Sequence, residues 1–134
     1  MNLHRPVKYL WALPTTAVGL LFVVPTLLTR GRAQWIDGVL ELHGGATAWF
    51  LRRGTNLWLP GGAAAMTLGH VVLGVDGATL ARTRAHERVH VRQCERWGPL
   101  FLPAYLLSSL IQWCRGRDAY YDNPFEREAY AQAP

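Results

Sequence analysis

The chain has 134 residues, the length of one ordinary domain. Half of its residues are apolar and only 17% are charged, whereas about a quarter of a typical soluble domain is charged. This deficit of charge indicates a membrane protein, and the formal net charge of +5 suits an anionic surface. The two cysteines, Cys94 and Cys114, form neither a C-x-x-C motif nor a disulfide framework, so we expect two reduced thiols packed on helices.

The N-terminal segment contains an uncharged run at residues 9–29, between Lys8 and Arg30. A membrane-spanning helix needs about 20 such residues. A cleavable signal peptide is the alternative, but its apolar part would be only about 7–15 residues long and would end in a cleavage site of small residues. We therefore predict that residues 1–33 are a single-pass N-terminal anchor. Basic residues are balanced on its two sides, so the positive-inside rule assigns no orientation.

Residues 34–134 are predicted to form one α+β domain. Short apolar runs separated by glycine and proline predict a small antiparallel meander, with strands within 34–42, 47–53, 56–60 and 63–74. Longer runs without glycine predict helices at 78–97, 100–114 and 125–133. The membrane helix is thus expected to be followed by a small antiparallel sheet packed on helices.

The first of these helices contains the pattern H-E-x-x-H, formed by His86, Glu87 and His90. Residues four apart lie on the same helical face, which allows two imidazoles to bind one tetrahedral ion. Glu87 lies at the edge of that face, where a carboxylate can take a proton from an activated water and pass it to a leaving amine. The alternative is a pair of surface histidines on an amphipathic helix.

At 100° per residue, the helical face that carries His86 and His90 spans an arc of about 100°. The same arc contains Gln93, Cys94 and Trp97. Cys94 lies about 80° from His86, an awkward position for a metal ligand, so we expect it to pack in the core.

A catalytic zinc site needs a third protein ligand, and the last helix offers Glu126 and Glu128. Two residues apart on a helix, these carboxylates point about 160° away from each other, so only one of them can face the metal. The other is then a surface charge or a hydrogen-bond partner of a ligand.

H-E-x-x-H followed by a helix with E-x-x-A resembles the gluzincin branch of zinc metallopeptidases. The resemblance implies that His86, His90 and Glu126 bind Zn²⁺ and that Glu87 is the catalytic base. Tyr130 stands where that family usually has an acidic or amide residue, which keeps Glu128 as an alternative third ligand. The resemblance rests on two short segments. It also implies a zincin fold, in which a strand antiparallel to the bound substrate precedes the first helix, as residues 65–74 do.

Several other residues have alternative interpretations. His70 is a candidate hydrogen-bond donor to an oxyanion if it faces the cleft, and otherwise a polar residue on the solvent side of a strand. Tyr120 and Tyr121 are candidates for the same role or for packing. A second helical arc of about 120° predicts a solvated face or a contact with lipid phosphates; it consists of Arg84, Arg88, Arg92 and Arg96.

These observations predict a membrane-anchored zinc metallopeptidase with a peptide or protein substrate and with membrane lipid as a partner. No nucleic-acid-binding motif accompanies the arginines, so nucleic acid is not expected as a partner, and nothing in the sequence indicates an oligomeric state. The alternative is a zincin-like membrane module whose metal is structural or non-catalytic. A fourth protein ligand, such as Cys94 or His70, would indicate the alternative, whereas an open coordination position would indicate catalysis.

Overall fold

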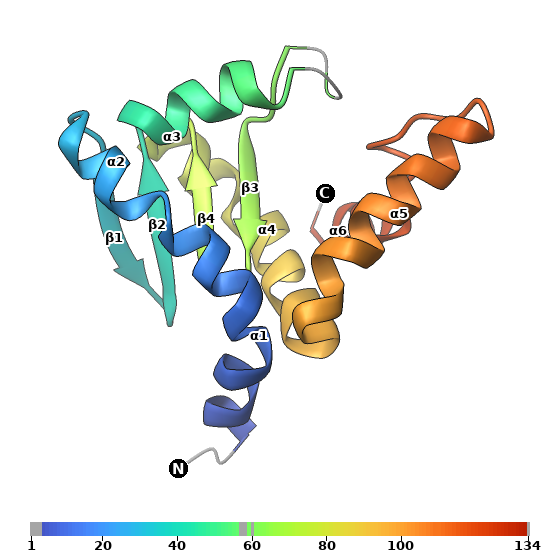
Figure 1. The fold of residues 1–134 in the computed structure, drawn as a ribbon, viewed down its shortest axis with the longest axis horizontal. Helices are drawn as coiled ribbons and strands as arrows, with labels where there is room; N and C mark the ends of the chain where they lie inside the picture. Colours follow the sequence, from blue (N-terminus) through green and yellow to red (C-terminus); the bar gives the residue numbers. More distant parts are fainter. Residues whose placement is uncertain (1–3, 57–58, 60, 134) are drawn as a thin grey trace.

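A four-stranded sheet lies between helices in the computed structural model, which describes residues 4–56, 59 and 61–133 (Figure 1). The strands are β1 (Arg32–Ile36), β2 (Val39–His43), β3 (Ala65–Leu68) and β4 (Val71–Gly74). The helices are α1 (His4–Leu20), α2 (Val23–Leu28), α3 (Gly45–Trp49), α4 (Gly77–Trp97), α5 (Phe101–Cys114) and α6 (Pro124–Gln132), with a π-helical turn at Phe50–Gly54 and a 3₁₀ turn at Gly98–Leu100. The predicted α+β class is confirmed.

The N-terminal helices follow each other with only a short turn between them. Together they cover Arg5–Leu28, which is long and apolar enough to cross a membrane, a property that a soluble core helix or a signal sequence can share. One side of α1 is attached to the rest of the protein. The hydroxyl of Thr15 donates to the carbonyl of Gly98 at 3.3 Å, and the hydroxyl oxygen of Thr16 accepts from the backbone N–H of His70 at 3.0 Å.

The sheet differs from the predicted antiparallel meander. Residues 34–42 do not form a single strand, because Asp37 and Gly38 make a turn between β1 and β2. Both turn residues have positive φ angles, 51° and 81°, as the tight hairpin turns that match the twist of a sheet require. Residues 63–74 likewise contain a hairpin rather than one strand. The strand order is β1-β2-β4-β3, and β2 pairs with β4 in parallel, so the sheet is mixed.

The strand predicted at 47–53 is wrong, because this segment is helical from Gly45 to Gly54. Its buried side chains explain the difference, since they recur with the spacing of a helix rather than with strand alternation. They are Thr47, Ala48, Leu51 and Thr55. Part of the strand predicted at 56–60 lies outside the described residues.

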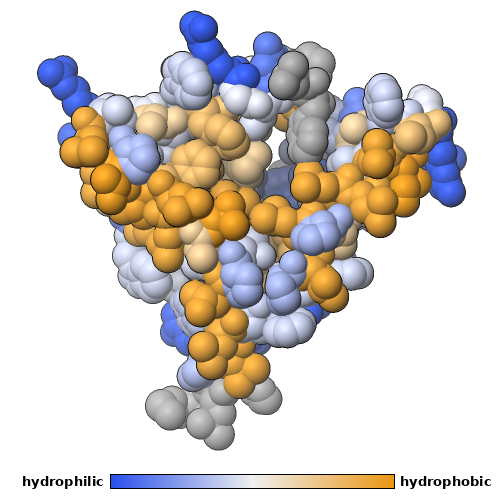
Figure 2. Space-filling view, in the orientation of Figure 1, coloured by the Kyte–Doolittle hydropathy of each residue, from blue (hydrophilic) through white to orange (hydrophobic). Residues whose placement is uncertain are grey.

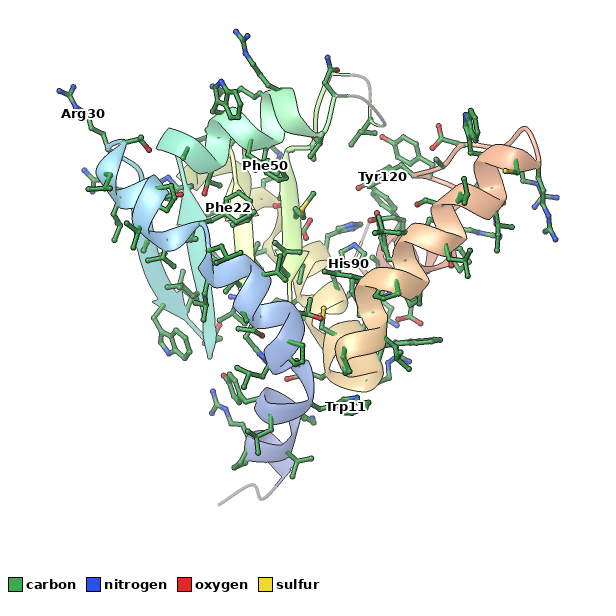
Figure 3. The ribbon with its side chains drawn as sticks, in the orientation of Figure 1. Trp11, Phe22, Arg30, Phe50, His90 and Tyr120 are labelled. Atoms are coloured by element: carbon green, nitrogen blue, oxygen red, sulfur yellow. The ribbon has the colours of Figure 1, made fainter. Side chains whose placement is uncertain are left out.

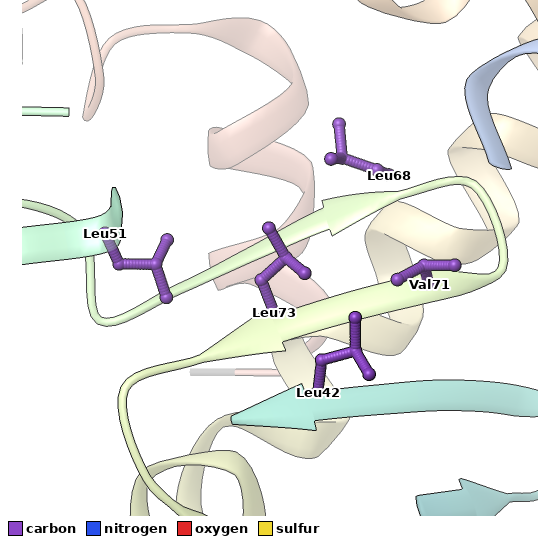
Figure 4. Close-up of a cluster of buried hydrophobic side chains, with 5 residues drawn as sticks. All are labelled: Leu42, Leu51, Leu68, Val71 and Leu73. Atoms are coloured by element: carbon purple, nitrogen blue, oxygen red, sulfur yellow. The ribbon is translucent and has the colours of Figure 1, made fainter. Parts of the chain in front are cut away.

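Helices cover both faces of the sheet, and side chains alternate between the faces along each strand. One cluster of buried side chains packs on the side of α1, α2 and α3 (Figure 4) and consists of Leu42, Leu51, Leu68, Val71 and Leu73. A second cluster packs under α4 and consists of Val39, Val72, Leu80 and Val91. Strand β3 is the last strand of the sheet, and α5 and α6 lie beyond it (Figure 1).

The three C-terminal helices match their predicted ranges to within about one residue at each end. Helix α4 begins after Asp76, whose side chain accepts from the N–H of Thr79, and it ends at Gly98, which has a positive φ of 57°. Helix α6 begins after Asn123, whose side chain accepts from the N–H of Phe125. Local capping therefore sets the ends of the two helices that carry the H-E-x-x-H and E-x-x-A motifs.

Apolar side chains gather on one face of the molecule, along the outer sides of α1, α2 and α5 (Figure 2). We call this surface the apolar face; its exposed residues are Leu10, Leu13, Leu21, Val24, Leu28, Leu106, Leu107, Leu110 and Ile111. At a rise of 1.5 Å per residue, the 14 residues of α5 extend over about 21 Å, which is less than the roughly 30 Å of a hydrocarbon core.

Two of the four arginines in the predicted arc of α4, Arg84 and Arg88, do not lie on a free solvated face, which corrects the prediction for them, whereas Arg92 and Arg96 are exposed. Glu41 on β2 is only 1% exposed, and it accepts two hydrogen bonds from Arg84 at 2.9 and 3.0 Å and one from Arg88 at 3.0 Å. Burial alone would raise the pKa of Glu41, but the hydrogen bonds and charges of the two arginines outweigh it and lower the pKa below its usual value. These ion pairs attach α4 to the sheet.

We predict that Glu41→Gln lowers the free energy of unfolding by about 3 kcal/mol, because it leaves two half-buried guanidinium groups without a carboxylate. Since the folded-state pKa of Glu41 is lowered, its contribution is present above its usual pKa and is lost as the pH falls through the folded-state value. Thermal and denaturant unfolding in neutral detergent measures the difference.

Asp37→Asn is the matched control, because it removes the same charge from an exposed turn where asparagine tolerates a positive φ. Equal free energies of unfolding for Glu41→Gln and Asp37→Asn would contradict this account. So would a wild type that remains more stable than Glu41→Gln in acid.

Candidate metal centre

Helices α4 and α6 bring together the three side chains that the resemblance assigned as metal ligands. The Nε2 atoms of His86 and His90 lie 3.1 and 3.0 Å from the same oxygen, Oε1, of Glu126. The potential ligand atoms of all three residues lie within 4.8 Å of one another. We call this cluster the metal centre. His90 and Tyr120 both lie in the space between β3 and α5 (Figure 3).

The cluster fits the requirements of a divalent metal ion. Tetrahedral bonds of 2.0–2.1 Å place neighbouring ligand atoms about 3.3 Å apart, close to the separations between the imidazoles and the carboxylate. Two imidazoles and one carboxylate suit zinc, iron and manganese alike. The donor set therefore supports a metal site without identifying the ion.

Gln93 orients both His90 and the helix that carries Glu126. The Nδ1–H of His90 donates to Oε1 of Gln93 at 2.7 Å, which directs Nε2 of the same ring towards the metal centre. The amide nitrogen of Gln93 donates to the carbonyl of Phe125 at 2.9 Å and to the carboxylate of Glu128 at 3.0 Å. The sequence placed Gln93 on the histidine arc but assigned it no role; its position three residues after His90 was the available signal.

Tyr105 on α5 completes the surroundings of Glu126. Its hydroxyl donates to Oε2 of Glu126 at 2.6 Å, so that Oε1 is the oxygen that faces the histidines. The side-chain amide of Asn123 donates to the carbonyl of Tyr105 at 3.0 Å and to the hydroxyl of Ser109 at 2.8 Å, which ties the start of α6 to α5. Sequence analysis did not identify Tyr105, because nothing in the local pattern connects α5 with Glu126.

The electrostatics of the cluster keep Glu126 ionised and His90 protonated. Burial opposes both charges, but the hydrogen bonds from His86, His90 and Tyr105 lower the pKa of Glu126 to about 2. Burial likewise lowers the pKa of His90, and the hydrogen bond and charge of Glu126 reverse this effect and raise it to about 9. Binding of a cation therefore requires His90 to release the proton on Nε2.

Glu87 is buried beside the metal centre and is held in place by strand β3. The hydroxyl of Thr67 on β3 donates to Oε2 of Glu87 at 2.7 Å. Burial raises the pKa of Glu87 above its usual value, although the charge of His90 and the hydrogen bond from Thr67 partly oppose this. A raised carboxyl pKa suits a group that both accepts and donates a proton near neutral pH.

Two cavities meet at Glu87. A cavity of about 140 Å³ lies between β3 and α5, and one of about 400 Å³ opens on the side of His86. The residues that line both are Leu59, Ala63, Ala65, Glu87 and Tyr120. Together the cavities form a groove that follows β3 past Glu87.

The backbone of β3 offers hydrogen-bonding groups to this groove. A two-residue turn joins β3 to β4, and the N–H of Val75 donates to the carbonyl of Ala64. These two observations show which residue pairs of the antiparallel strands exchange backbone hydrogen bonds, because such pairs alternate with unbonded pairs. In this register Ala65 and Thr67 do not bond to β4, so their N–H and C=O groups point to the free edge of the sheet. An extended peptide could pair with these groups.

Two candidate residues have their closest partners outside the metal centre. Glu128 contacts Gln93 and Arg96 rather than the two histidines. His70 lies in the turn after β3, where its Nε2–H donates to Glu95 at 2.9 Å, and it lines neither cavity at Glu87.

The remaining candidates pack around the helices. The ring of Tyr130 lies 4.4 Å from that of His86, and its hydroxyl is 3.2 Å from that of Tyr120. Cys94 is buried between Ala12 and Phe101, as expected for a core thiol, and burial raises its pKa to about 12.

We predict that Gln93→Ala weakens zinc binding about 10- to 100-fold, because His90 loses the partner that directs its Nε2 atom. Competition with a fluorescent chelator measures the dissociation constant. Gln132→Ala, at the end of α6, is the control and should retain wild-type affinity. Identical affinities for Gln93→Ala and the wild type would show that this hydrogen bond does not support a metal site.

Comparison with known proteins returned no match, whether with family models, with curated protein sequences or with solved structures. The functional argument therefore rests on the arrangement of His86, Glu87, His90 and Glu126 beside the groove.

Proposed function

We propose that the protein is a membrane-anchored, zinc-dependent metallopeptidase of gluzincin type. The observation that carries this proposal is the position of Glu87. Its buried carboxylate lies beside the metal centre and at the junction of the two cavities along β3. A cluster that could hold a metal, a buried carboxylate and a groove along β3 thus lie together, which supports the proposal.

Each residue has a separate part in the proposed reaction. His86, His90 and Glu126 would hold the ion, which when bound supplies Lewis acidity and lowers the pKa of a coordinated water to about 7. Glu87 takes the proton from the attacking water and delivers it to the leaving amine, and Thr67 holds its carboxylate in position. Tyr120 lines both cavities and is a candidate hydrogen-bond donor to the developing oxyanion.

The edge of β3 supports a peptide as the substrate. An extended segment that adds to this edge would pair with the free backbone groups of Ala65 and Thr67, and its scissile bond would lie near Glu87. The order of the elements also agrees with a zincin-like arrangement: an edge strand, then the helix with H-E-x-x-H, then a later helix with the third ligand.

A structural metal site is the alternative function, and the surroundings of the cluster favour catalysis over it. Within the described part of the chain, no fourth His, Cys, Asp or Glu joins His86, His90 and Glu126. The two residues considered as a fourth ligand are engaged elsewhere, Cys94 in the core under α1 and His70 with Glu95. An ion held by His86, His90 and Glu126 would therefore have a position left for water.

Association with a bilayer is supported by the apolar face and by the apolar helical segment Arg5–Leu28. We propose that this segment anchors the protein and that the exposed side of α5 lies at the same bilayer. The division into an anchor at residues 1–33 and a peptidase domain at residues 34–134 remains our prediction.

We predict that Glu87→Gln retains the metal and loses peptidase activity by a factor of about 10²–10⁴, because the water loses its proton acceptor. A library of fluorescence-quenched peptides, incubated with the zinc-loaded protein in detergent, measures cleavage. Glu128→Gln is the matched control, since it removes a carboxylate from α6 outside the metal centre. Cleavage at equal rates by Glu87→Gln and the wild type would favour the structural-metal alternative. The same conclusion would follow if the zinc-loaded wild type cleaved no peptide of the library.

A further inference from the structure

A second cluster of charged side chains surrounds a cavity of about 550 Å³ that shares no lining residue with the two cavities of the groove. The cavity is formed by the first turns of α1, the β1–β2 turn, the β3–β4 turn and one side of α4. Its charged lining residues are Arg5, Lys8, Arg88, Arg92, Asp37 and Glu95, and His70 and Tyr9 also line it. We call it the cationic cavity. None of these residues belongs to the metal centre, and the proposed hydrolysis does not use them.

Positive charge prevails in the cationic cavity. Four cationic side chains and two carboxylates line the cavity; Glu95 is already paired with His70 at 2.9 Å, and Arg88 is paired with Glu41 at 3.0 Å. Among the described residues, no carboxylate lies within ion-pair distance of Arg5, Lys8 or Arg92. An anionic ligand would therefore meet cations whose charge no neighbouring carboxylate already compensates.

Two buried nitrogen atoms at this cavity lack hydrogen-bond partners within the described residues. Arg88 uses Nη2 for Glu41 and for the carbonyl of Ile36, both at 3.0 Å, while its Nη1 is buried and unpaired. The side chain of His70 is only 4% exposed, and its Nδ1 is also unpaired. Buried polar groups are nearly always paired, and a guanidinium nitrogen can only donate. Arg88, which lines the cavity, thus carries a buried donor that has no acceptor among the described residues.

The residues around the cavity indicate which kind of anion fits it. Guanidinium groups bind phosphate oxygens with favourable geometry, and several cations around one cavity suit a phosphate. Lys8 is followed directly by the uncharged residues of α1, and Leu10 and Leu13 are exposed on the apolar face. A phosphate in the cavity would therefore lie where the apolar surface begins, as a lipid headgroup lies at the end of its acyl chains.

We propose that the cationic cavity binds the phosphate group of a membrane phospholipid, through Arg5, Lys8, Arg88 and Arg92. The acyl chains lie along the exposed leucines of α1. Bound in this way, the lipid places the N-terminal end of α1 at the headgroup level of the bilayer. This binding is independent of the metal centre.

The test compares two double variants that each remove two positive charges. Lys8→Gln/Arg92→Gln removes exposed cations from the cavity, and Arg82→Gln/Arg127→Gln removes exposed cations elsewhere on α4 and α6. Binding of glycerol 1-phosphate is measured by calorimetry in neutral detergent, with inorganic phosphate as a second probe. Binding to vesicles of phosphatidylcholine, with and without phosphatidylglycerol, is measured by flotation. Unchanged unfolding temperatures and zinc content show that both variants are folded.

We expect the cavity variant to bind glycerol 1-phosphate and phosphatidylglycerol vesicles at least about tenfold more weakly than the wild type, and the control variant to lose much less. An equal loss of binding in the two variants would show that net charge alone explains the effect, and it would overturn the proposal. Tight binding of inorganic phosphate with no preference for phosphatidylglycerol vesicles would assign the cavity to free phosphate and overturn the lipid assignment.

Discussion

The candidate site depends on the hydrogen bonds that one buried carboxylate, that of Glu126, accepts. It accepts hydrogen bonds from two imidazoles of α4 and from the hydroxyl of Tyr105, and so joins three helices at one point. Its low pKa, about 2, means that the charge is maintained at any physiological pH. The imidazole protons compensate the charge of this buried anion, and the same side chains would form a ligand set if a cation replaced those protons. The same contacts therefore join the three helices and would hold the ion of the proposed metal site.

The sheet positions the site through two contacts with α4, one from β2 and one from the edge strand β3. Glu41 attaches α4 to the sheet by ion pairs with Arg84 and Arg88. These ion pairs hold the H-E-x-x-H helix in position against the strands. Thr67 then contacts Glu87 from the edge strand. The apolar face of α1, α2 and α5 lies on one surface of the molecule (Figure 2). The cavity along β3 is bounded by side chains of β3, α4, α5 and α6.

Local patterns predicted the parts of this arrangement that depend on local physics. The spacing of His86 and His90 and the ranges of α4 and α6 are local properties of single helices, and the opposition of Glu126 and Glu128 follows from helical geometry. The turn at Asp37-Gly38 was missed, although an Asp-Gly pair between apolar runs is a hairpin signal. The helix at residues 45–54 was missed because a short apolar run does not distinguish strand from helix.

The remaining features depend on contacts between distant segments. The parallel pairing of β2 with β4, and the contacts of Thr67, Gln93 and Tyr105 with the site, join residues that only the folded chain brings together. X-ray absorption spectroscopy of the zinc-loaded protein tests the central claim most directly. The account predicts two imidazole nitrogens and further oxygen ligands with no sulfur, unchanged in Glu128→Gln, and little bound zinc in His90→Ala or Glu126→Ala. A sulfur ligand, or a wild-type spectrum in Glu126→Ala, would contradict it.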